Sequence, residues 1–130
     1  MTVFTTQDPL GELGAIRSWI LSSLPAPVIK SARAAENAGA FRVIEGIYTA
    51  PNFQSGDPPY SENGGFVFNG PVPAVQVMEE MRFALAVPAS PLPPPGYPIL
   101  EYAHGTGGDY RSFIEDGTAG LLARRGIASI

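Results

Sequence analysis

The chain has 130 residues, of which 45% are hydrophobic and 10% aromatic, proportions typical of a folded domain rather than a disordered one. Its net charge of −4 and its scattered basic residues argue against a nucleic-acid-binding protein. The sequence has no cysteine and one histidine, which excludes disulfides, a thiol nucleophile and a multi-histidine metal site, and we expect no metal or cofactor.

The first predicted element is a helix that begins at Asp8-Pro9 and ends before Pro25. The carboxylate can cap the first free N–H groups, and proline is tolerated at the first helical position. The apolar residues recur at steps of three and four and predict one apolar stripe: Leu10, Leu13, Ile16, Ile20, Leu21 and Leu24. Residues 25–40 have little apolar face and predict a connector. Residues 1–40 are therefore expected to form a helical lead to the domain of residues 41–130.

Two strands separated by a long loop are predicted next. Residues 41–50 are typical of a strand, residues 52–65 of a long polar loop, and residues 65–70 of a short extended piece. From Ala74 to Val87 the odd positions are nearly all apolar and the even ones polar or small. This period of two predicts a long half-buried strand with its odd positions inward.

A β-α-β unit closes the sequence. After a proline-rich linker over residues 88–96, residues 97–103 predict a buried strand, residues 110–125 a helix and residues 127–130 a second strand. Between the first strand and the helix lies a glycine-rich turn, which places backbone N–H groups beside a helix N-terminus.

This turn, His104-Gly105-Thr106-Gly107-Gly108, carries a resemblance to a known family. A strand, His-Gly-X-Gly-Gly, a helix, Arg-Gly and a strand together resemble the third strand, oxyanion loop, first helix and fourth strand of α/β-hydrolases such as esterases and lipases. The match covers residues 97–130, about a quarter of the chain. It implies an α/β fold: a partial α/β-hydrolase sheet with antiparallel N-terminal strands and then a β-α-β unit, preceded by a helix and truncated at a strand.

The resemblance also implies roles for the turn. Ester hydrolysis passes through a tetrahedral intermediate whose negative oxygen is stabilised by backbone N–H donors. The Thr106 N–H would be one donor, and its hydroxyl a further contact. His104 would brace the loop rather than act as the base, and Gly105, Gly107 and Gly108 would shape it.

The catalytic residues of such an enzyme are missing from the sequence. There is no GxSxG elbow, and the single histidine already lies in the turn, so no Ser-His-Asp set can be assembled. We therefore expect a fragment of a serine carboxylic-ester hydrolase, inactive alone, whose small-molecule ester substrate and catalytic residues belong with a missing C-terminal half. A separate chain could also supply that half.

The alternative is a non-catalytic α/β binding or interaction module in which HGTGG is only a tight turn. The turn lacks the GxxxxGK[ST] pattern of a phosphate-binding loop and the GxGxxG spacing of a dinucleotide site. No apolar stretch approaches the roughly 18–20 residues that span a bilayer, and no signal peptide is visible, so we expect no membrane span and assign no compartment.

Overall fold

The computed structural model describes residue 8 and residues 10–60 and 64–130. The chain forms two compact units, one of Met1–Pro27 with Ala50–Glu79 and one of Val28–Thr49 with Glu80–Ile130. These units interleave along the chain. The boundary expected after residue 40 divides the sequence in another way and stays a prediction.

The first unit begins with the predicted helix, α1 (Gly11–Ser23). Asp8 caps it, since its Oδ1 accepts hydrogen bonds from the N–H groups of Leu10 (3.2 Å) and Gly11 (3.0 Å). Pro9, expected at the first helical position, lies outside the described residues. Of the predicted apolar stripe, only Ile16 is buried, so the helix is confirmed and its buried stripe is not.

The rest of this unit is mostly loop, as the sequence predicts for residues 52–65, of which 61–63 lie outside the described residues. A small antiparallel pair follows, β3 (Phe68–Asn69) and β4 (Val72–Pro73). The Trp19 ring of α1 packs edge-on against Phe53, with ring centroids 5.7 Å apart. Phe53 and Ile16 are buried apolar residues of this unit within the described chain.

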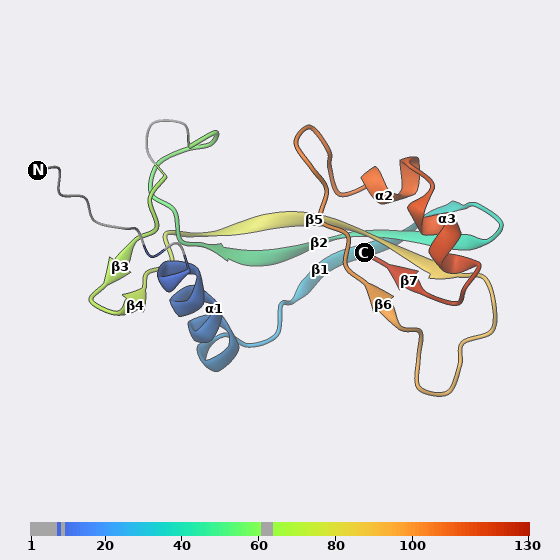
Figure 1. Cartoon of the computed structure of the whole chain (residues 1–130), viewed down its shortest axis with the longest axis horizontal. Helices are drawn as coiled ribbons and strands as arrows, with labels where there is room; N and C mark the ends of the chain where they lie inside the picture. The colour runs from blue at the N-terminus through green and yellow to red at the C-terminus, as the bar shows by residue number, and fades with distance from the viewer. Residues whose placement is uncertain (1–7, 9, 61–63) are drawn as a thin grey trace, which may run out of the picture. The chain divides into compact units, whose positions relative to one another are not determined.

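The fold is mixed α/β, and its main sheet has five strands that pair in both parallel and antiparallel directions (Figure 1). They are β1 (Ile29–Asn37), β2 (Phe41–Asn52), β5 (Val77–Pro88), β6 (Ile99–Leu100) and β7 (Ala128–Ser129), in the spatial order β1-β2-β5-β7-β6. β1 pairs antiparallel with β2, and β7 pairs antiparallel with β5 but parallel with β6. The predicted antiparallel strands followed by a β-α-β unit are therefore present.

The prediction of a connector before residue 40 is wrong, because β1 occupies most of it. Every residue of β1 is exposed, so the strand lacks the alternation of polar and apolar residues that marks a half-buried strand. Its pairing with β2, for example Arg33 opposite Glu45, is what makes it a strand.

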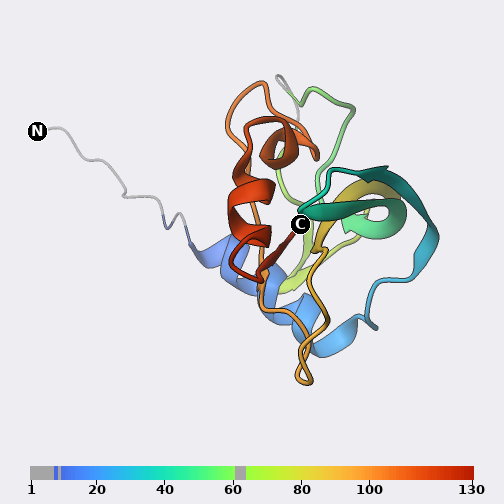
Figure 2. The same cartoon turned by 90° about the vertical axis from the view of Figure 1, so that its right-hand side faces the viewer.

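The predicted inward face of β5 is also wrong. The long strand exists, but its buried positions are the even ones near its C-terminal end, Ala84, Ala86 and Pro88. Ala84 and Ala86 belong to the same buried cluster as residues of the two short helices described next, which lie together on one side of the sheet (Figure 2). Small residues on this face leave room for those helices. The core of the second compact unit, which holds most of this sheet, consists of Phe41, Val43, Ala84, Ala86, Phe113, Ala119 and Ala123.

The single helix predicted over residues 110–125 is divided into α2 (Ser112–Glu115) and α3 (Thr118–Ala123). Gly117 breaks it with a φ of +85°, a left-handed conformation that glycine adopts without steric cost. The first strand of the unit, β6, is also shorter than residues 97–103. The backbone pairing nevertheless continues past it, since the Tyr102 N–H donates to the Ile130 carbonyl at 2.8 Å.

Candidate functional site

The glycine-rich turn after β6 is a tight four-residue turn. The Gly108 N–H donates to the Gly105 carbonyl at 3.0 Å, which places Thr106 and Gly107 at its two central positions. Gly107 has a φ of +82°, as the third residue of a type II turn requires. The sequence thus dictates this geometry, because an L side chain at Gly107 would be strained.

The two central amides of the turn are available to a ligand. Thr106 and Gly107 are exposed, and across residue 8 and residues 10–60 and 64–130 neither N–H donates to a protein acceptor. An exposed backbone N–H group without a protein acceptor can donate to a negative oxygen. The arrangement is therefore chemically able to bind an anion or an oxyanion.

His104 lies against the turn rather than in a catalytic arrangement. Its Nδ1 is 2.9 Å from the Gly105 carbonyl oxygen, to which it donates when Nδ1 carries the proton. A Cβ at Gly108 would lie 2.9 Å from both the Cβ of His104 and the Oγ of Ser112. Glycine at this position therefore lets the histidine and Ser112 close on the turn from two sides.

The C-terminal end of the turn is held by local hydrogen bonds. The Asp109 N–H donates to Ser112 Oγ at 2.8 Å, and Asp109 Oδ1 accepts from the Arg111 N–H at 2.7 Å. These bonds lead the chain into α2.

Arg111 links this end to the sheet. Its guanidinium pairs with Glu45 on β2 through Nη1, and with Glu36 on β1 through Nη2 at 3.1 Å. Burial lowers the pKa of Arg111, but hydrogen bonds and charge from Glu36 and Glu45 outweigh it and raise that pKa above its usual value. Sequence reasoning missed this residue, because its partners lie 66 and 75 residues away and no local spacing indicates them.

The N-terminal end of the turn is held by Tyr102. Its hydroxyl donates to Asp116 Oδ2 at 2.8 Å. The pKa of Asp116 is lowered by hydrogen bonds first from the Thr118 backbone N–H, then from the Thr118 side chain and the Tyr102 hydroxyl. The pKa of Tyr102 is raised, chiefly by the same hydrogen bond to Asp116.

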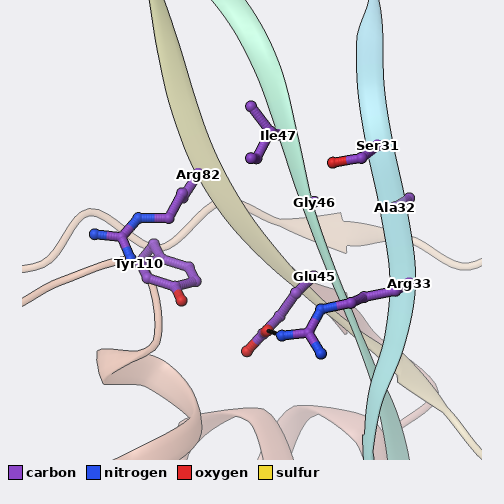
Figure 3. Close-up of a pocket in the computed structure, with 8 residues that line it drawn as sticks. All are labelled: Ser31, Ala32, Arg33, Glu45, Gly46, Ile47, Arg82 and Tyr110. Carbon is purple, nitrogen blue, oxygen red and sulfur yellow. Dashed lines mark hydrogen bonds and ion pairs between the residues drawn. The ribbon is translucent and has the colours of Figure 1, made fainter.

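A cavity of about 250 Å³ lies beside Tyr110, two residues after the glycine turn (Figure 3). The Arg82 guanidinium lies over the Tyr110 ring, 5.0 Å from its centroid. Thr106 is not among the lining residues, which are Ser31, Ala32, Arg33, Glu45, Gly46, Ile47, Arg82 and Tyr110.

In the described part of the chain, no group of three or more histidine, aspartate or glutamate residues is arranged to hold a metal ion. Over the same residues, no helix is long and apolar enough to cross a membrane. Comparison of the chain with protein-family models, curated proteins and solved structures found no match.

Proposed function

We propose that this chain is the oxyanion-loop portion of a serine carboxylic-ester hydrolase. The observation that carries the proposal is the turn of Gly105–Gly108, whose two central N–H groups have no acceptor within the described residues. Esterases and lipases need such preorganised donors at the oxygen that becomes negative in the transition state.

The topology around the turn supports the same proposal. β6 and β7 are parallel neighbours connected through α2 and α3, and β2 and β5, which precede them, each have an antiparallel neighbour in the sheet. The turn leaves the C-terminal end of β6, where open α/β sheets bind their ligands. This is the arrangement expected for the N-terminal part of an α/β-hydrolase sheet.

In this mechanism the Thr106 N–H donates to the developing oxyanion, and the Thr106 hydroxyl adds a contact. The second donor, the nucleophilic serine, the acid and the histidine base belong to the missing C-terminal half of the fold. The chain alone is therefore proposed to be inactive, and its substrate is a small-molecule ester.

The exposed apolar residues of β6 favour the proposal that a further part of the fold lies beside this strand. Ile99 is 65% exposed and Leu100 38% exposed, although strands of parallel sheets are usually buried on both faces. No strand pairs with the outer edge of β6 in the described residues. A neighbouring strand and its helices would cover this apolar edge.

The second candidate is a binding module in which HGTGG is only a tight turn. The observation that favours it is the cavity of Figure 3, whose lining comes from the sheet and Tyr110 and does not include the turn.

A serine-reactive phosphonate probe tests the two functions. The protein is produced from its whole open reading frame and, separately, as residues 1–130, and labelled peptides are identified by mass spectrometry. The hydrolase predicts one labelled serine, beyond residue 130, and no label on the shorter chain. Absence of labelling in the long form, or labelling within residues 1–130, would contradict the proposal.

A further inference from the structure

We propose that Arg111 is a positioning residue that holds the glycine turn in place through its ion pairs with Glu45 and Glu36. This inference rests on the proposed function for its catalytic meaning, but its structural part can be tested without any ester chemistry. It concerns a residue that touches neither the turn's central amides nor a substrate.

The turn is fixed at its two ends, and between them it has only its own contacts to the Gly105 carbonyl, from the Gly108 N–H and the His104 ring. On the N-terminal side, Tyr102 is bonded through its backbone to Ile130 and through its hydroxyl to Asp116. Residues 103–107 are exposed. On the C-terminal side the first side chain that reaches the sheet by ion pairs is that of Arg111. Arg111 therefore acts on the C-terminal end of the turn together with the local hydrogen bonds of Asp109 and the packing of Tyr110 and Phe113 in the core.

The ion pair of Arg111 with Glu45 is better shielded than an ordinary surface pair, whereas Glu36 is more exposed. The side chain of Arg111 is 24% exposed and that of Glu45 15% exposed, whereas Lys30 and Glu80 form a pair in which both side chains are at least half exposed. Water screens a shielded pair less, and a guanidinium can satisfy two carboxylates at once. Arg111 thus ties the loop to both β1 and β2.

The sheet can tolerate the loss of Arg111. Glu45 Oε2 also accepts a hydrogen bond from Arg33 Nη2 at 3.0 Å, so its charge keeps a partner when Arg111 is replaced. Arg111→Gln should therefore loosen the turn without unfolding the sheet.

The test measures amide hydrogen exchange by ¹⁵N NMR in three variants of the protein produced from its whole open reading frame. They are Arg111→Gln, Glu36→Gln, which removes one partner, and the control Arg125→Gln. Arg125 donates only to the Leu121 carbonyl of its own helix. In Arg111→Gln we expect the Gly108 amide, which is bonded within the turn, to exchange about tenfold faster or more, while amides of the core strands stay protected. Glu36→Gln should show the same change in weaker form, and Arg125→Gln should match the wild type.

An unchanged turn in both Arg111→Gln and Glu36→Gln would overturn the inference. If Arg111→Gln unfolds the chain, the exchange of the Gly108 amide in Glu36→Gln decides the inference: faster exchange supports it, and unchanged exchange overturns it.

Ester hydrolysis by the protein produced from its whole open reading frame supplies the catalytic readout. A positioning role predicts that Arg111→Gln lowers kcat with little change in KM, because the oxyanion donors act in the transition state, and that Arg111→Lys restores part of kcat. Equal kcat in Arg111→Gln and the wild type would overturn the catalytic meaning. A loosened turn in a protein without ester hydrolysis would leave the anchoring intact and refute the proposed function instead.

Discussion

Gly107 sets the shape of the turn through its backbone alone. Its φ is +82°, and apart from its two chain neighbours no described residue has an atom within 4 Å of the place where a Cβ would be added. Gly105 also has open space there but lacks the left-handed φ, which makes it a matched control.

We expect Gly107→Ala to destabilise the chain by about 1–2 kcal/mol, because an L residue pays that cost in the left-handed region. Gly105→Ala should cost clearly less. Urea unfolding of both variants measures the difference, and equal losses would show that the left-handed geometry of the turn is not required.

Asp116 joins the N-terminal anchor of the turn to α3. It accepts hydrogen bonds from the Thr118 N–H at 2.8 Å and from the Tyr102 hydroxyl, and these bonds lower its pKa below the usual value of an aspartate. A carboxylate with a depressed pKa contributes stability that is fully present above its unfolded pKa and is lost as the pH falls through its folded pKa.

We therefore expect Asp116→Asn to be less stable than the wild type at pH 7, with the difference shrinking as the pH falls below about 4. Denaturant unfolding from pH 7 down to pH 2 measures this difference. A difference that stays constant over that range would contradict the role of the charge.

At the scale of the elements, β5 packs its small residues against the helices. Ala84 is 1% exposed and belongs to the core with Phe113 and Ala119. Ala34 on β1 is exposed and offers the same substitution at a solvated position of the sheet.

Ala84→Leu should lower the free energy of unfolding by about 1–3 kcal/mol, because a packed core does not accept extra methylene groups without strain. Ala34→Leu should stay within about 0.5 kcal/mol of the wild type. Thermal unfolding followed by circular dichroism compares them. If Ala34→Leu were the more damaging, the assignment of the buried face would be wrong.

Sequence patterns predict the local features of the fold but not those that depend on distant partners. The stop before Pro25, the cap at Asp8 and the turn around Gly107 are local, so spacing and backbone preference predict them. The buried face of β5 and the strand β1 depend on what packs or pairs with them, which local patterns do not contain. The oxyanion-loop candidates could be named from the sequence because the turn is a local pattern. The role of Arg111 could not, because its partners lie far away in the sequence.

At the scale of the whole molecule, the described chain leaves apolar surface on its sheet edge. An exposed apolar edge strand is a site where chains pair with one another. We expect the isolated 130-residue chain to self-associate through β6, and Ile99→Lys to reduce this without lowering the melting temperature. Sedimentation velocity measures the association. Equal association in Ile99→Lys and the wild type would show that the chain does not self-associate through this edge.

The central claim is that the turn presents backbone N–H donors to a developing oxyanion, and one substitution isolates that donor. Thr106 occupies the second position of the turn, where proline is favoured, so Thr106→Pro keeps the turn and deletes the N–H. Thr106→Val keeps the N–H and removes only the hydroxyl.

The decisive measurement is kcat on a short-chain ester, made with the protein produced from its whole open reading frame. We expect Thr106→Pro to lower kcat by about 10²–10³-fold with little change in KM, as the loss of one oxyanion donor does, while Thr106→Val keeps most of the activity. A Thr106→Pro enzyme with the kcat of the wild type would contradict it.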